Sequence, residues 1–389
     1  MIKSNKSSRL SSLSKAVTTA LAGAVLSAGM LAFPAGAADK APEIKEIERI
    51  AFEYREEAPK FMAEYDSMDK VNAFNKSAAD TMKFTDIKPK LIKVKSELDG
   101  TEIEVALYEP QFCEKSTATC PVYKEGERKG IRRADRPLIL FSHGGGYLFR
   151  TAYYEAAHMQ MIANTTQSLV AVPRYRLSYE KPFPAALVDS YSALDYLYNN
   201  AAEYRIDQDH IFLWGESAGG NLAAGLALYN RDHYDFPIAA QILFAPMLDY
   251  RTGTDKSPYK STVAGEVTWT AKSNAFAWSQ YGNPEEVSRM GPDPRKKMIS
   301  KTDYMGYFSP VMAQDKSRLP ATYIFVGDID LFAQESVSYA NDLLNANVPV
   351  DLNVSEGLFH WFDRASADAE RTSEYYDSIF SYFKRHLNY

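Results

Sequence analysis

Cysteine and histidine are scarce in this chain of 389 residues, which contains two cysteines and six histidines. Structural metal sites usually need four such side chains close together, and neither cysteine has a histidine or a third cysteine nearby. We therefore expect no metal site. Internal repeats and low-complexity tracts are also missing beyond the first 37 residues, and the composition is that of an ordinary globular protein.

The two cysteines, Cys113 and Cys120, are seven positions apart in the segment QFCEKSTATCPVY. In an exported protein such a pair is expected to form a local disulfide that closes a small loop. Two free surface thiols are the alternative.

The chain has fewer basic than acidic residues. It contains 44 Lys and Arg and 50 Asp and Glu, which gives a formal net charge of −6. An acidic protein repels phosphate backbones and anionic lipid surfaces. Nucleic acid is therefore not expected as a partner.

The first 37 residues differ from the rest, because they are basic and apolar and contain no acidic residue. The apolar stretch Ala16–Phe33 is followed by the small residues Ala35–Ala37. Four basic residues precede it: Lys3, Lys6, Arg9 and Lys15. This layout predicts a cleavable signal peptide over 1–37, and hence a secreted or periplasmic protein. Cleavage would take the net charge from −6 to −10. An uncleaved membrane anchor is the alternative. No cysteine lies near the cleavage point for a lipid anchor, and after cleavage no stable membrane insertion is expected.

Hydrophobic periodicity divides the remaining chain into three parts. Residues from about Pro42 to Phe84 have the period of amphipathic helices, and two alternating segments around Asp99-Gly100 predict a β-hairpin. Short apolar runs then alternate with amphipathic helices, which indicates an α/β fold with a mostly parallel sheet covered on both faces. In such sheets, ligands bind beyond the carboxyl ends of the strands. The runs are PLILFSH, SLVAVPRY, HIFLWG, AAQILFAPM, ATYIFVG and VPVDLNVSE.

One of these strands leads into a candidate nucleophile. The segment Gly215-Glu216-Ser217-Ala218-Gly219 follows HIFLW and precedes a helical NLAAGLAL. In this strand–turn–helix context the G-x-S-x-G pattern predicts a tight, strained turn that lifts the serine hydroxyl out of the sheet. The two glycines would let the strand and helix backbones pass close together. Without that context, a serine that caps a glycine-rich helix start would explain the pattern.

A second glycine cluster, His143-Gly144-Gly145-Gly146, follows the strand PLILFS. Glycines in this place let backbone N–H groups point into a cavity, as acyl transfer requires for its tetrahedral oxyanion. We assign the oxyanion donors to the N–H groups of Gly145, Gly146 and Ala218. A phosphate-binding loop is the alternative, but it would continue with Lys and Ser or Thr, whereas this one continues Tyr-Leu-Phe-Arg. His143 precedes the glycines and is expected to have a structural role.

A serine nucleophile needs a histidine base and an orienting carboxylate, in the chain order Ser, Asp or Glu, His. Two late histidines fit this order. His386 lies near the end of an apparent helix, whereas His360 lies in a loop after a late strand, so we expect His360 to be the base. Asp328 and Asp330 both follow the strand ATYIFVG, and composition alone does not separate them.

Several motifs occur together in the order of a known family. The chain from about Pro137 onward resembles the bacterial hormone-sensitive-lipase-like (family IV) esterases of the α/β-hydrolase superfamily. The resemblance is carried by HGGG, YRLSYEKPFPAAL, GESAGG, APMLDYR, VGDIDLFAQESVSYA and SEGLFHWFD. It selects Asp330 as the acid and supports His360 as the base. Two departures are Glu216, where many relatives have Asp, and the unusual run YLFRTAYYEAAH after HGGG.

The resemblance also implies a domain organisation. After the signal peptide (1–37) we expect an N-terminal helical cap segment (38–85) and an α/β-hydrolase catalytic domain (86–389) with a cap insert at about 253–307. No individual cap residue is assigned.

The expected activity is that of a serine carboxylesterase. Ser217, His360 and Asp330 would cleave short- to medium-chain carboxylic esters through an acyl-enzyme, with a small-molecule ester as the partner and no cofactor. A homodimer remains open. An amidase, lactonase or peptidase with the same triad is the alternative within enzymes, and a non-catalytic binding protein on the same fold is the alternative outside them.

Overall fold

The computed structural model describes residues 44–81, 87–111, 135–151, 155–290 and 303–387. The expected signal peptide and the pair Cys113 and Cys120 lie outside these residues, so both remain predictions. Within the described ranges, no helix has the length and hydrophobicity that crossing a bilayer requires.

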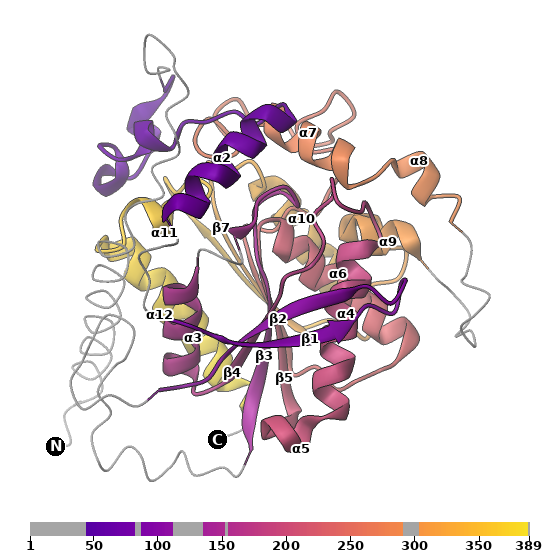
Figure 1. Ribbon diagram of the computed structural model, residues 1–389. Helices are drawn as coiled ribbons and strands as arrows, with labels where there is room; N and C mark the ends of the chain where they lie inside the picture. The colour runs from indigo at the N-terminus through magenta and orange to yellow at the C-terminus, as the bar shows by residue number, and fades with distance from the viewer. Residues whose placement is uncertain (1–43, 82–86, 112–134, 152–154, 291–302, 388–389) are drawn as a thin grey trace, which may run out of the picture.

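In the part of the chain that the structure describes, a single twisted sheet of eight strands runs through the molecule (Figure 1). Its spatial order is β1-β2-β4-β3-β5-β6-β7-β8, in which the strands from β4 to β8 are parallel and β1 and β2 are antiparallel to their neighbours. The strands are β1 (Lys90–Lys95), β2 (Glu102–Tyr108), β3 (Arg136–Ser142), β4 (Leu169–Pro173), β5 (Ile206–Glu216), β6 (Ala240–Phe244), β7 (Ala321–Gly327) and β8 (Val350–Ser355).

Each apolar run of the sequence forms a strand, and every residue of β4 and β6 is buried. This burial confirms the prediction of a mostly parallel sheet that is covered on both faces. The hairpin is also confirmed: β1 and β2 pair antiparallel, and Gly100 takes the left-handed φ of +78° in the turn between them.

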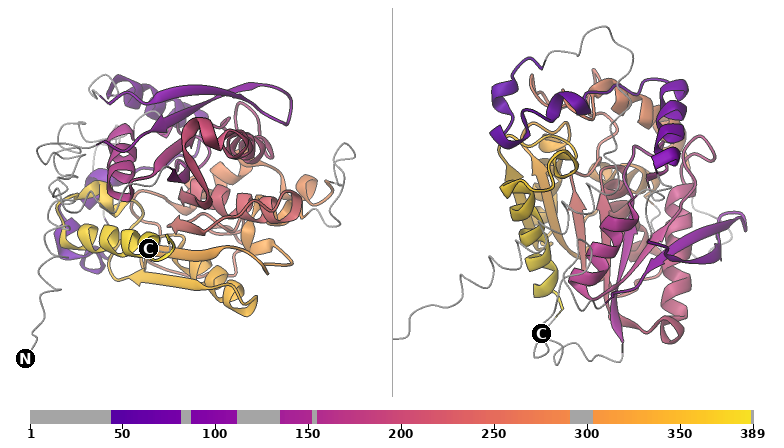
Figure 2. Two further views of the ribbon diagram at one scale, coloured as in Figure 1. Left: turned by 90° about the horizontal axis from the view of Figure 1, so that it is seen from below. Right: turned by 60° about the vertical axis from the view of Figure 1, so that its left-hand side comes forward.

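Helices cover both faces of the sheet (Figure 2). Helices α3 and α12 contact each other on one face, and α4 and α6 contact each other on the other, while α10 packs on β7 and β8. The helices are α2 (Met68–Thr81), α3 (Ala156–Thr166), α4 (Ala185–Asn199), α5 (Ala201–Tyr204), α6 (Ala218–His233), α7 (Ala271–Tyr281), α8 (Pro284–Val287), α9 (Tyr304–Phe308), α10 (Ala333–Asn345), α11 (Phe362–Ala365) and α12 (Glu370–Arg385).

The N-terminal segment is less regular than its periodicity predicted. It forms three short 3₁₀ helices, η1 (Ile47–Arg49), η2 (Phe52–Tyr54) and η3 (Ala58–Phe61), before α2 begins. The helical prediction is therefore confirmed for α2, whereas the described residues before it form only these short turns, whose apolar side chains dock on other parts of the chain. Tyr54, for example, packs edge-on against Phe359 and Phe362 and hydrogen-bonds to Thr372.

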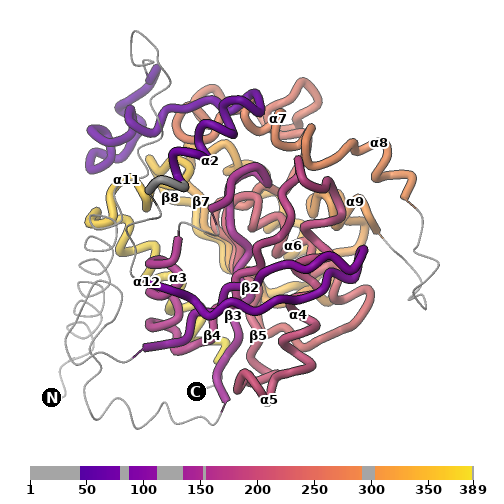
Figure 3. Tube along the Cα trace, in the orientation of Figure 1, coloured from indigo at the N-terminus to yellow at the C-terminus, as the bar shows by residue number. Residues whose placement is uncertain are grey.

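Two segments far apart in the sequence lie above the sheet, where the tube view shows α2 and α7 at the top of the molecule (Figure 3). Two hydrogen bonds join these parts of the chain: the N–H of Tyr65, before α2, donates to the side-chain Oγ of Ser273 at 2.8 Å, and the N–H of Thr268, before α7, donates to the carbonyl of Phe61 at 3.1 Å. The N-terminal segment and the insert therefore meet over the end of the sheet where the chemistry was expected.

Candidate active site

Ser217 occupies the turn between β5 and α6, in a backbone conformation that is rare for a residue with a side chain (φ 56°, ψ −121°). The two glycines around it permit this turn. A Cβ on Gly215 would lie 2.0 Å from the carbonyl oxygen of Gly219, and a Cβ on Gly219 would lie 1.9 Å from that of Ser142. Strand and helix backbones thus touch here, as the G-x-S-x-G pattern predicted.

The three residues expected to form a triad come together at this turn. His360 Nε2 lies 2.9 Å from Ser217 Oγ, and His360 Nδ1 lies 2.8 Å from Asp330 Oδ2. All three are at most 2% exposed. The imidazole therefore bridges the hydroxyl and the carboxylate in the arrangement that general-base activation of a serine requires.

The structure distinguishes between the two aspartates after β7. The second oxygen of Asp330 accepts the N–H of Phe332 at 2.9 Å, which leaves Oδ2 facing His360. Asp328 instead binds Arg49 and the N–H of Gly357. Asp330 is thus the carboxylate that contacts the base.

The HGGG segment forms a tight turn beside the serine. Gly145 and Gly146 have φ values of +102° and +60°, which only glycine adopts at low cost. In the described part of the chain, the N–H groups of Gly145, Gly146 and Ala218 donate to no backbone carbonyl. They remain available for an oxyanion, and Ala218 adds the positive end of the α6 dipole.

His143 supports this turn from below. Its ring stacks on Tyr175 at a centroid distance of 4.1 Å, and its Nδ1 lies 2.9 Å from Thr151 Oγ1. Tyr175 donates to the carbonyl of His143, and Thr151 donates to that of Gly144. Burial lowers the pKa of His143 to about 4, so the ring is neutral at pH 7 and acts as a structural hydrogen-bonding group.

A small pocket of about 250 Å³, its open mouth included, leads to Ser217 and His360. Most of its wall is aromatic. Its other lining residues are Tyr65, Gly145, Phe149, Thr268, Trp269 and Trp361. The sequence did not predict Tyr65, Thr268 or Trp269, because they come from cap segments without a recognisable motif. Trp361 could have been found, since it directly follows His360.

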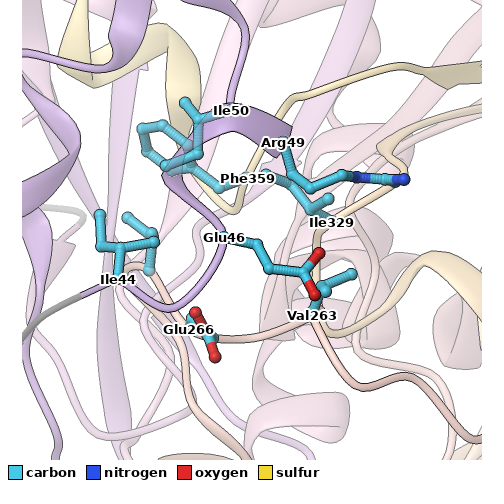
Figure 4. A pocket seen from close by; sticks show the side chains of 9 residues that line it. Ile44, Glu46, Arg49, Ile50, Val263, Glu266, Ile329 and Phe359 are labelled. Carbon is cyan, nitrogen blue, oxygen red and sulfur yellow. The ribbon is translucent and has the colours of Figure 1, made fainter.

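A second pocket is lined by the residues that precede the acid and the base, Ile329 and Phe359 (Figure 4). Its other walls come from the N-terminal segment, where Ile44 and Ile50 supply apolar surface, and from the insert, where Val263 does. Ser217 and His360 do not line this pocket. The pocket therefore lies at the contact between the N-terminal segment and the loops that carry the proposed acid and base.

One cluster has the residue types of a metal site: ligand atoms of Glu155, His158 and Glu216 lie within 4.8 Å of one another. However, Arg364 Nη2 donates to His158 Nδ1 at 2.9 Å, and burial lowers the pKa of His158 well below its usual value. The ring is therefore neutral and carries its proton on Nε2, the atom that faces the cluster, so it has no lone pair there for a metal. The donor set does not fit a metal ion.

The strand order and a strained serine at the turn after β5 define the α/β-hydrolase class of fold. A family profile described as alpha/beta hydrolase fold matches residues 139–364. The chain belongs to this family, and the membership predicted from the motifs is confirmed.

Similar proteins agree with this assignment. The chain is 30% identical over 229 residues to a protein of Acanthamoeba polyphaga mimivirus named as an alpha/beta hydrolase, covering 58% of this chain and 61% of that one. It is 28% identical over 221 residues to an arylesterase of Saccharolobus solfataricus, covering 56% and 66%. The match thus spans under two thirds of either relative.

Among solved structures, a bacterial heroin esterase superposes with a TM-score of 0.68 at 24% identity, covering 87% of this chain and 99% of that one. At this level of identity the likeness establishes the fold.

Proposed function

We propose that the protein is an exported serine carboxylesterase that hydrolyses short- to medium-chain carboxylic esters through an acyl-enzyme. The observation that carries the proposal is the pair of contacts made by His360, at 2.9 Å to Ser217 Oγ and at 2.8 Å to Asp330 Oδ2. Relatives named as an arylesterase and as carboxylesterases support the reaction class.

In the proposed reaction, Ser217 Oγ attacks the ester carbonyl while His360 Nε2 takes its proton. Asp330 holds the ring in the tautomer with a proton on Nδ1 and stabilises the imidazolium. The N–H groups of Gly145, Gly146 and Ala218 bind the oxyanion, where one donor is typically worth ~10²–10³ in rate. His360 then protonates the leaving alcohol, and water hydrolyses the acyl-enzyme with the same base.

The pocket supports the proposed preference for small substrates. Tyr65, Phe149 and Trp269 line it with rigid aromatic rings, which leave little room beside Ser217 and His360. Long, flexible acyl chains would not fit between these rings without a rearrangement of the cap.

The central experiment measures hydrolysis of p-nitrophenyl esters of graded acyl length by the purified protein. We expect acetate and butyrate to be hydrolysed fastest. Ser217→Ala should remove activity, whereas Ser190→Ala, a change at an equally buried serine of α4, should leave it intact. His360→Gln and His386→Gln form a second matched pair, of which only the first should be inactive. Activity that survives Ser217→Ala would overturn the proposal.

The same protein can be tested against the rival reactions. Hydrolysis of p-nitroanilides or lactones at rates above those of the esters would reassign the enzyme to amide or lactone chemistry. Emulsified long-chain triglyceride hydrolysed faster than butyrate would contradict the chain-length preference. A wild-type protein inactive on all these substrates would instead support a binding role.

Export is proposed from the basic and apolar character of residues 1–37. Mass spectrometry of the mature protein should give a chain that begins at Ala38. Thiol alkylation without reduction should label neither Cys113 nor Cys120, and reduction should expose both. A full-length mass would contradict cleavage, and labelling before reduction would contradict the disulfide.

A further inference from the structure

A buried polar cluster lies directly behind the nucleophile turn. It joins three elements: Glu216, the last residue of β5; Glu155 and His158, at the start of α3; and Asp363 and Arg364, in α11. The Arg364 side chain is 18% exposed and those of Glu216 and Asp363 at most 1%. Carboxylates buried to this extent are stable only when they are paired or protonated.

Arg364 is the centre of this cluster. Its Nη2 lies 3.0 Å from Glu216 Oε2, 3.2 Å from Glu155 Oε1 and 2.9 Å from His158 Nδ1, and its Nη1 pairs with Asp363. One guanidinium thus contacts all three elements. Tyr376 of α12 closes the cluster by donating to Asp363 Oδ2 at 3.0 Å.

The charges in the cluster do not balance if every carboxyl is ionised, because three carboxylates would face one guanidinium. Burial raises the pKa of Glu216 to about 8, against the lowering effect of Arg364, and it raises the pKa of Glu155. Burial therefore favours the protonated form of Glu216, whose carbonyl oxygen still accepts from Arg364. The contact between them is a hydrogen bond that a neutral acceptor can maintain.

The hydrogen bond between Glu216 and Arg364 connects two residues that lie close in the sequence to the nucleophile and to the base. Glu216 directly precedes Ser217, and Arg364 follows His360 by four positions. The bond therefore spans from the turn that carries the nucleophile to the loop that carries the base. The required distance between Ser217 Oγ and His360 Nε2 is short, at 2.9 Å, and a displacement of about 1 Å can cost ~10²-fold in rate.

We propose that Arg364 is a positioning residue of the hydrolase site: through Glu216 it holds the base-bearing loop at hydrogen-bonding distance from the nucleophile. This inference rests on the proposed function. The inference assigns the effect of the cluster to the chemical step, in which the serine and the imidazole must meet. Substrate binding should be unaffected, because none of the cluster residues lines the pocket.

The test compares Arg364→Met with a matched control, Arg231→Met. Arg231 is also a buried arginine, 8% exposed, but it lies at the far end of α6, where it binds the carbonyls of Asp315 and Ser317. About 13 residues of helix, roughly 20 Å, separate it from the nucleophile turn. Both variants are expected to lose thermal stability, so a loss of stability alone does not distinguish them.

The distinguishing measurement is kcat per active site, with active sites counted by stoichiometric p-nitrophenol release from a p-nitrophenyl phosphonate. For Arg364→Met we expect kcat on p-nitrophenyl butyrate to fall by about 10–100-fold with KM nearly unchanged. Arg231→Met should keep the wild-type kcat. Equal kcat values per titrated site in both variants would overturn the proposal.

Variants of Glu216 test the same link without removing the arginine. Glu216→Gln keeps a carbonyl acceptor for Arg364 and should retain kcat, whereas Glu216→Leu removes it and should lose kcat as Arg364→Met does. The double variant Arg364→Met with Glu216→Leu should be no worse than either single change, because one link is lost in each case. Additive losses would show that the two residues act separately.

Failure of this inference is distinguishable from failure of the proposed function. If Ser217→Ala abolishes hydrolysis while Arg364→Met and Glu216→Leu keep kcat, the enzyme stands and only the positioning role is wrong. If Arg364→Met does not fold, the Glu216 pair decides the question.

Discussion

Arg49 and Asp328 are joined at 2.9 Å although 279 positions separate them in the sequence. The other oxygen of Asp328 accepts the N–H of Gly357 at 2.6 Å, three residues before the base. The carboxylate next to the proposed acid is therefore engaged by the N-terminal segment and by the loop that leads to His360. Two aspartates that the local sequence presents alike thus have different partners.

The first prediction separates these two aspartates. Asp330→Asn should lower kcat/KM by about 10³–10⁴-fold, because an amide at this place no longer stabilises the imidazolium or selects its tautomer. Asp328→Asn should lower kcat/KM by less than tenfold and mainly reduce thermal stability through the lost contact with Arg49. Kinetics on p-nitrophenyl butyrate and thermal unfolding of both proteins check this. The reverse order of activity losses would assign the acid to Asp328.

The second prediction concerns the close backbone contact at the nucleophile turn. Gly219→Ala would place a Cβ 1.9 Å from the carbonyl oxygen of Ser142, and backbone atoms cannot move aside cheaply. We expect a loss of stability of at least about 1–3 kcal/mol and little activity. Gly282→Ala is the control, because its Cβ would meet only side-chain atoms, at 3.2 Å or more. Chemical denaturation measures both, and a Gly219→Ala protein as stable as the control would contradict the tight turn.

The third prediction concerns the pH dependence of stability. Burial raises the pKa of Glu216 to about 8, so the folded protein keeps a proton that the unfolded chain releases near its ordinary pKa of about 4.5. Stability from this group is therefore present at low pH and is lost as the pH rises through this window to about 8. The groups around it are Arg364, Glu155, Asp363, His158, Tyr375 and Tyr376.

Glu216→Gln removes this titration and leaves those neighbours in place. The melting temperature of the variant minus that of the wild type should therefore increase between pH 5 and pH 8 and level off above. Thermal unfolding at intervals of pH measures the difference. A constant difference across the range would mean that Glu216 is ionised in the folded protein.

The fourth prediction concerns the pocket. Trp269 lines it and packs against the glycine turn, where a Cβ on Gly146 would lie 2.4 Å from the indole. Trp269→Ala should widen the pocket and shift the preferred p-nitrophenyl ester toward longer acyl chains. Trp278→Ala is the control, since Trp278 is as buried but does not line the pocket. An unchanged chain-length profile in Trp269→Ala would place the acyl chain elsewhere.

The sheet and the triad residues could be predicted because their signals are local. A buried strand needs an apolar run, and a strained serine turn needs Gly215 and Gly219 within four positions. Chain order reduced the six histidines to His360 and His386, and the position of His360 in a loop after a late strand, with His386 in an apparent helix, selected His360. The choice between Asp328 and Asp330 needed either a family pattern or the structure, because it depends on distant partners.

The cap and the buried cluster could not be predicted for the same reason. Tyr65 and Trp269 reach the pocket from separate segments, and nothing in either local pattern indicates the other. Arg364 looks like an ordinary charged residue near the C-terminus, and only the fold brings it to Glu216. The helical period from about Pro42 to Phe84 correctly predicted α2, but the residues before it form only 3₁₀ turns, because apolar side chains such as Tyr54 dock individually on the body of the protein.

The contact between Ala51 and Gly357 has a consequence for the loop that carries the proposed base. The Ala51 N–H donates to the Gly357 carbonyl at 2.9 Å, so the N-terminal segment is hydrogen-bonded to this loop three residues before His360. A cut in the chain between Ala51 and the helix α2 would therefore weaken the support of the imidazole while every strand of the sheet stayed intact.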